Sequence, residues 1–141
     1  MIIIDTNVFS ELINARSDSP VLTWAASVEP QSLYYTAITR AEIRYGIERL
    51  APGKRKDELA IRAQQLFVMA SDQHLNFDGL AADAYGYIVA QRESIGRRIS
   101  IPDAQIAAIA YIHQAVLATR HVKDFEDCGI RLFNPWVDTR A

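Results

Sequence analysis

The sequence predicts an α/β fold, in which a single three-layer α/β/α domain is built on a mainly parallel sheet of about five strands. Short apolar segments alternate with longer segments of helical periodicity, the pattern typical of a sheet covered by helices on both sides. Residues 2–4 are three isoleucines in a row, as expected for a strand buried on both faces. The chain has 141 residues, half of them hydrophobic, and no repeat or linker divides it. We therefore expect one domain over residues 1–141.

The expected elements follow one another along the whole chain. Strands are predicted at residues 2–4, 33–36, 75–77, 116–119 and 130–133. Helices are predicted at residues 8–14, 20–27, 39–50, 55–71, 79–94 and 103–114. Residues 51–54 contain Pro-Gly and are interpreted as a turn between two helices. In the last helix, Ile106, Ile109, Ala110 and His113 share one face at spacings of three and four, which predicts that this face packs on the core.

Composition excludes several classes of protein. The formal net charge is −2, so a nucleic acid must be bound by local basic patches rather than by a basic arm. A single cysteine, Cys128, excludes an internal disulfide and favours a reduced, cytoplasmic protein. No apolar run approaches the ~18 residues of a membrane span, and Asp5 interrupts the N-terminal run too early for a signal peptide. The chain has no Gly-rich phosphate-binding motif, which argues against an ATPase or a dinucleotide-dependent enzyme.

Three acidic residues stand at predicted boundaries between elements. Asp5 follows the first strand, Glu42 lies three residues after Thr39 at a predicted helix start, and Asp103 follows Pro102. Sites in parallel sheets form at the carboxyl ends of the strands, so we expect the three acids at one rim. Each acid alone also fits a structural role, as a helix cap, a capping-box partner or a first-turn acid.

Clustered carboxylates point to a divalent cation. Two such charges 4 Å apart repel by about 4 kcal/mol at an effective dielectric of 20, which a cation would relieve. Oxygen ligands without His or Cys support favour Mg²⁺ or Mn²⁺ over zinc, and these ions suit phosphodiester chemistry. Thr6 and Asn7 are candidates for orienting Asp5, or are ordinary residues of a helix start. Arg40 and Arg44 are candidates for contacting phosphate, or are simply exposed.

Four segments resemble, in order and at similar spacings, those of the PIN-domain ribonucleases. They are residues 3–8, 39–46, 101–108 and 118–125, and residues 133–136 resemble a frequent ending of these proteins. The resemblance extends from residue 2 to about residue 138. It is greatest to VapC-type toxins of bacterial toxin–antitoxin pairs, particularly the FitB-like branch.

The resemblance implies a function for the acidic residues. It implies an Mg²⁺- or Mn²⁺-dependent endoribonuclease that hydrolyses RNA phosphodiesters with a metal-activated water. Asp5, Glu42 and Asp103 match the catalytic acids of the family. It further implies a homodimer, and inhibition by a cognate antitoxin protein whose C-terminal part reaches into the acidic site.

The fourth segment departs from the family pattern. After Thr119 and Arg120, relatives commonly carry Asp or Asn, whereas this chain has His121. Asp124 matches another acid often found in this segment, and we expect it to supply the fourth carboxylate. His121, a softer ligand than Mg²⁺ prefers, is then a partner of the acids, a substrate contact or an exposed loop residue without a role. Thr119 is a further candidate for orienting the acids.

Two other functions use the same acids. A phosphoaspartyl phosphatase also places acids at strand ends, but the haloacid type needs an Asp two residues after its nucleophile, where this chain has Asn7. A catalytically silent PIN-like module would use the acidic pocket only to receive a basic partner. The sequence does not identify the RNA target.

Overall fold

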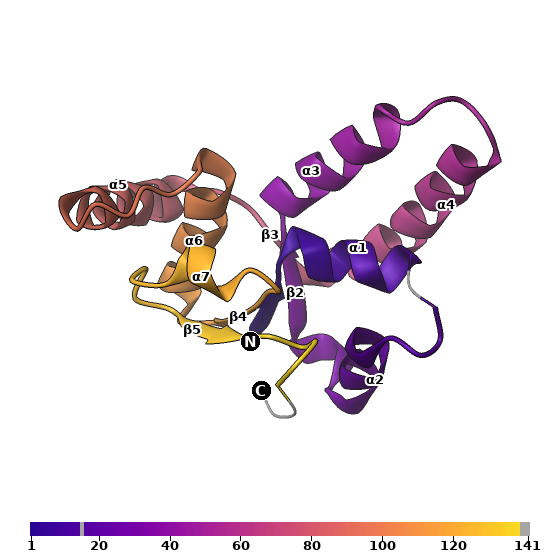
Figure 1. Cartoon of the computed structure of the whole chain (residues 1–141), viewed down its shortest axis with the longest axis horizontal. Coiled ribbons are helices and arrows are strands. Elements are labelled where there is room, and N and C mark those ends of the chain that lie inside the picture. Colours follow the sequence, from indigo (N-terminus) through magenta and orange to yellow (C-terminus); the bar gives the residue numbers. More distant parts are fainter. Residues whose placement is uncertain (15, 139–141) are drawn as a thin grey trace.

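A central parallel sheet organises the molecule (Figure 1). The computed structural model describes residues 1–14 and 16–138. Five strands lie in the order β3-β2-β1-β4-β5, and all the paired strands run parallel. Their bounds are β1 (Ile2–Ile4), β2 (Leu33–Thr36), β3 (His74–Leu75), β4 (Val116–Ala118) and β5 (Arg131–Phe133). The carboxyl ends of the central strands therefore meet at one edge of the sheet.

Helices connect the strands and cover the sheet. They are α1 (Thr6–Asn14), α2 (Pro20–Ser27), α3 (Ala37–Glu48), α4 (Lys54–Met69), α5 (Gly79–Ser94), α6 (Ile101–His113) and the short α7 (Val122–Phe125). Two short 3₁₀ turns, Pro30–Ser32 and Ser71–Gln73, precede β2 and β3. In Figure 1, α1 to α4 lie to one side of the sheet and α5 to α7 to the other. The predicted three-layer α/β/α fold is confirmed.

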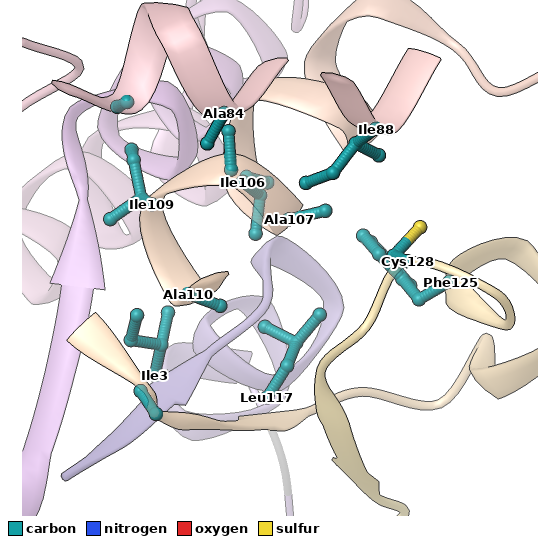
Figure 2. Close-up of a cluster of buried hydrophobic side chains, with 13 residues drawn as sticks. Ile3, Ala84, Ile88, Ile106, Ala107, Ile109, Ala110, Leu117, Phe125 and Cys128 are labelled. Atoms are coloured by element: carbon teal, nitrogen blue, oxygen red, sulfur yellow. The ribbon is translucent and has the colours of Figure 1, made fainter. Parts of the chain in front are cut away.

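Successive residues of β1 enter two separate cores. Ile3 packs with residues of α5 and α6, in the cluster drawn in Figure 2, whereas Ile4 packs with residues of α1 and α4. In β4, Leu117 likewise belongs to the core that contains Ile3, and Ala118 belongs to the core that contains Ile4. Because side chains alternate along a strand, a sheet with two covered faces needs apolar residues at every position, and the isoleucine run supplies them.

Helix α3 begins two residues earlier than predicted. Thr36 caps it, because its hydroxyl accepts a hydrogen bond from the amide of Thr39 at 3.1 Å. The alternative interpretation of Thr39 and Glu42 as a capping box is therefore wrong. Glu42 lies in the second turn, where its side chain is free for other contacts.

Other boundaries differ for local reasons. Helix α6 begins at Ile101, because Ser100 caps it through the amide of Asp103. His113 is exposed, so the core face predicted for this helix ends at Ala110. Helix α7 was not predicted, since four residues give no readable periodicity. Within residues 1–14 and 16–138, every helix is too short or too polar to cross a membrane.

Candidate active site

Asp5 is a buried carboxylate at the carboxyl end of the central strand. Only 4% of its surface is exposed. The backbone amide of Thr6 donates to its Oδ1 at 2.8 Å, and the Asn7 amide and the Thr119 hydroxyl donate to its Oδ2 at 2.8 and 2.7 Å. Three donors hold the side chain in one orientation. Thr6 and Asn7 therefore orient Asp5, as the sequence suggested, and Thr119 adds a third bond.

Thr119 links the end of β4 to the rest of the site. Its side chain is fully buried, and its hydroxyl oxygen accepts a hydrogen bond from the amide of His121 at 3.1 Å while the hydroxyl donates to Asp5. The side-chain oxygen of Asn7 accepts from the amide of Arg120 at 3.0 Å. The carboxyl ends of β1 and β4 are thus fastened together through side chains.

Glu42 joins the site from the neighbouring strand β2 and its helix α3. The hydroxyl of Thr6 donates to Glu42 Oε1 at 2.6 Å, and the same hydroxyl lies 3.1 Å from that of Thr39. Threonines at the starts of α1 and α3 therefore hold Glu42 beside Asp5. Glu42 therefore lines the cleft, where sequence analysis had left a capping-box role open as the alternative.

Asp103 and Asp124 complete the acidic lining from the other side of the sheet. A cleft of about 520 Å³ opens at the carboxyl edge. Its acidic lining is formed by Asp5, Glu42, Asp103 and Asp124. Asp5 lies between β1 and α1, and the other three acids come from α3, α6 and α7. His121 also lines the cleft and is exposed.

Burial raises the pKa values of two of these acids, and at one of them the neighbouring carboxylates add to the shift. Burial raises the pKa of Asp5, against the opposing effect of hydrogen bonds from Thr119, Thr6 and Asn7. Burial also raises the pKa of Asp103, and the negative charges of Asp5, Asp124 and Glu42 raise it further. Ser100 acts in the opposite direction. Neighbouring carboxylates thus make the ionised form of Asp103 costly.

The donor set fits a hard divalent cation that keeps water ligands. All four acids offer oxygen atoms, and the mutual repulsion felt at Asp103 is what a cation would relieve. Among residues 1–14 and 16–138, no three acidic, His or Cys side chains are close enough to form a ready cage for an ion. Mg²⁺ is commonly held by one or two carboxylates with water in its remaining positions, so a complete protein cage is not required.

Arg40 does not reach the cleft. Its guanidinium lies 4.5 Å from the centre of the Phe67 ring, and Arg44 lies 4.9 Å from the same ring. Arg40 is two residues from Glu42, which in an α-helix places the two side chains on nearly opposite faces. Because Glu42 faces the acids, Arg40 faces α4, away from them.

Arg55 is a cleft residue that sequence analysis missed. It extends from the first turn of α4 into the cleft lining, as Ser10 and Asn14 do from α1. The four ion pairs found within residues 1–14 and 16–138 do not include it. The predicted turn at residues 51–54 was the available signal, because an antiparallel helix pair brings the start of α4 back beside the end of α3.

Comparisons with known proteins agree with this fold and site. The model of the PIN domain family matches residues 2–127. The chain therefore belongs to the PIN domain family. Among its relatives, the VapC ribonuclease Y4jK of Sinorhizobium fredii is 37% identical over 96% of this chain and 98% of its own length. The toxin FitB of Neisseria gonorrhoeae is 35% identical over 98% of this chain and 100% of its own.

A solved structure supports the same relationship. The structure of FitAB bound to an IR36 DNA fragment contains a chain that superimposes with a TM-score of 0.90 at 34% identity, covering 99% of both chains. The similarity therefore includes every element that supplies an acid to the cleft. The predicted resemblance to PIN-domain proteins of the VapC and FitB type is confirmed.

Proposed function

We propose that this protein is a metal-dependent endoribonuclease and the toxin component of a bacterial toxin–antitoxin pair. The observation that carries the proposal is the convergence of Asp5, Glu42, Asp103 and Asp124 on one cleft. Similarity to a VapC ribonuclease and to the toxin FitB favours RNA as substrate and a toxin as the class. We assign the four acids as the catalytic and metal-binding residues.

Each acid would contribute differently to the proposed site. Asp5 is held by three hydrogen bonds, which suits a ligand of fixed position for Mg²⁺ or Mn²⁺. Glu42 keeps one carboxylate oxygen beyond the one bound to Thr6, and can accept a proton or bind a water there. Asp103 of α6 and Asp124 of α7 would complete the set from the other side of the sheet. When bound, the metal would lower the pKa of a water and offset the charge of the phosphate.

Arg55 is the cation that we propose for substrate binding. A nuclease of net charge −2 with an acidic cleft needs positive charge near the phosphate path. Arg55 lines the cleft and has no carboxylate partner among the described ion pairs, so it is free to contact a phosphate. The apolar residues beside it, Ile47, Leu50 and Leu59, form a wall suited to the face of a base.

The identity of the nucleophile gives a sharp test of this chemistry. If water attacks, an RNA with a single 2′-deoxy nucleotide at the scissile position is still cut, and the products carry no cyclic phosphate. If the 2′-hydroxyl of RNA attacks, that substrate resists cleavage and normal RNA yields 2′,3′-cyclic ends. Mass spectrometry of the products distinguishes the two, and cyclic ends would overturn the proposed hydrolysis.

Partners of the protein follow from the same similarity. We propose a cognate antitoxin protein that covers the acidic cleft with a basic segment, together with a homodimeric, cytoplasmic toxin. Expression of the chain alone should arrest bacterial growth, and co-expression of the adjacent reading frame should restore it. Light scattering of the purified protein measures the oligomeric state, and a monomer at micromolar concentration would overturn the homodimer.

A further inference from the structure

Arg92 is a fully buried arginine with no acidic partner. It lies in the last turn of α5, and only 3% of its surface is exposed. No carboxylate pairs with it in residues 1–14 and 16–138. An isolated buried charge is costly unless hydrogen bonds compensate it, so the surroundings of this side chain need a physical explanation.

The guanidinium is instead surrounded by backbone oxygens from two other segments. Its Nε donates to the carbonyl of Arg97 at 2.7 Å, and its Nη2 donates to that of Arg98 at 3.3 Å. Its Nη1 donates to the carbonyls of Asp124 and Glu126 at 3.0 and 2.6 Å. All three nitrogens are used, and four carbonyl dipoles offset the charge.

Those two segments carry two of the four cleft acids. One bond goes to the carbonyl of Asp124 itself. The bonds to residues 97 and 98 hold the loop that leads to Ser100, the cap of α6, and so to Asp103 in its first turn. Arg92 does not line the cleft. It therefore acts on the acids only through the backbone.

The apolar packing around this arginine supports a rigid arrangement. Phe125 and Cys128, which flank its acceptors, belong to the same buried cluster as Ile88 of α5, as Figure 2 shows. The thiol of Cys128 lies 3.6 Å from Nη1 of Arg92 and adds a weak acceptor. Helix α7 has only four residues, too few to be stable alone, so its position depends on these contacts.

We propose that Arg92 is a positioning residue for the active site. Its buried guanidinium fastens the segment of Asp124 and the loop before Asp103 to the end of α5, and thereby sets how these two carboxylates face a bound metal. The predicted effect on metal binding rests on the proposed function, but the hydrogen bonds by which Arg92 holds the two segments do not depend on a metal. Lysine cannot replace arginine here, because one ammonium cannot span acceptors that the planar guanidinium reaches from three nitrogens.

Arg92→Lys and Arg97→Lys form a matched pair of variants. Arg97 contacts the same segment from its solvent side, through ion pairs to Glu126 at 3.3 Å and Asp127 at 2.8 Å and an exposed hydrogen bond to the carbonyl of Lys123 at 3.1 Å. Exposed ion pairs contribute little. We expect R92K to weaken Mn²⁺ binding, measured by calorimetry well below the melting temperature, by about 10- to 100-fold, as for partners that orient metal ligands. We expect R97K to change it by less than about threefold.

Amide hydrogen exchange tests the fastening without metal. R92K should accelerate exchange in residues 122–128 while leaving β1 and β4 protected, and R97K should not. Unchanged exchange and unchanged Mn²⁺ affinity in folded R92K would overturn the proposal. If the wild type itself binds no Mn²⁺, the metal proposal fails, and exchange alone decides the role of Arg92.

A measurement on the unmodified protein covers the case in which R92K does not fold. The Nε–H proton of Arg92, observed by NMR, should exchange slowly with solvent, and its resonance should shift when Mg²⁺ is added. The exposed Arg98 provides the comparison in the same spectrum. An Arg92 Nε–H that exchanges as fast as that of Arg98, or that ignores Mg²⁺ while Asp124 responds, would overturn the proposal.

Discussion

Replacing Asp103 with asparagine should stabilise the metal-free protein while destroying its proposed activity. The Asp103 carboxyl is half-buried, and the charges of Asp5, Asp124 and Glu42 add to the cost of its ionised form. Asn is nearly isosteric and uncharged, so Asp103→Asn removes the repulsion without leaving a cavity. Functional acids held together in this way reduce stability in exchange for activity.

The magnitude is set mainly by like-charge repulsion and the helix dipole, because burial and the Ser100 hydrogen bond act on Asp103 in opposite directions. Three like-charge repulsions at about 0.3–0.5 kcal/mol each give about 1–1.5 kcal/mol, an upper value because the site is partly solvated. The variant also loses the attraction of a first-turn acid to the amino end of α6, about 0.5 kcal/mol. The net expectation is a gain of about 0.5–1 kcal/mol, or about 2–4 °C in melting temperature.

Thermal melts in EDTA at pH 7 measure this gain, and Asp57→Asn is the control. Asp57 is also a first-turn acid, in α4, but it is exposed and outside the cleft. Its substitution should therefore lower stability by about 0.3–0.5 kcal/mol through the helix dipole alone. If D103N lowers the melting temperature as D57N does, the carboxylates do not repel one another as argued.

The pH dependence of the gain follows from the direction of the pKa shift. The folded-state pKa of Asp103 lies above its ordinary value of 3.8, so the folded protein binds this proton more tightly than the unfolded chain. The contribution of Asp103 to the free energy of unfolding therefore becomes less unfavourable as pH falls through the raised pKa. The advantage of D103N should shrink as pH falls from 7 towards 4. An advantage that grows on acidification would contradict this sign.

Further predictions concern the residues around the acids. Thr6→Val removes the hydroxyl that donates to Glu42; we expect a loss of about 1 kcal/mol in stability and about tenfold in cleavage rate, and recovery with Thr6→Ser. Wild-type cleavage by T6V would show that this bond is dispensable. Asp124→Asn should lower cleavage at least about 100-fold, and His121→Asn by less than about 100-fold, since outer partners commonly cost about 10- to 100-fold. The reverse order of initial rates would assign the fourth ligand to His121. Arg55→Ala should raise KM for RNA and lower the slope of log affinity against log salt by about 1. An unchanged salt slope in a binding titration would remove Arg55 from the phosphate path.

Much of the fold was predictable because its signals are local. The isoleucine run of β1 and the bounds of β2, α2 and α5 follow from periodicity and composition, and all four agree with the structure. Starts of helices were less predictable where two residues could cap. Thr36 and Thr39 both qualify, and the structure shows that Thr36 is the cap.

The acids were predictable from the chain, together with Thr6, Asn7 and Thr119 as candidates for orienting them. The positions of Asp5, Glu42 and Asp103 after strands and at helix starts suffice to place these three at one edge of a parallel sheet. Asp124 was expected only from the resemblance to PIN-domain proteins. Arg55 and Arg92 were not predictable in this way, because their roles depend on where a helix hairpin folds back and on which backbone surrounds a buried side chain. Arg40 illustrates the same point. It is close to Glu42 in sequence, but the two side chains lie on nearly opposite faces of α3.

The measurement that tests the central claim most directly is RNA cleavage by the wild type beside Asp5→Asn. A structured RNA is incubated with each protein in Mg²⁺, Mn²⁺ or EDTA, after circular dichroism has shown both to be folded and gel filtration has shown both to be free of partner. We predict metal-dependent cleavage by the wild type, none in EDTA and none by D5N. Cleavage by D5N at the wild-type rate, or equal cleavage in EDTA, would contradict an active site built on these carboxylates.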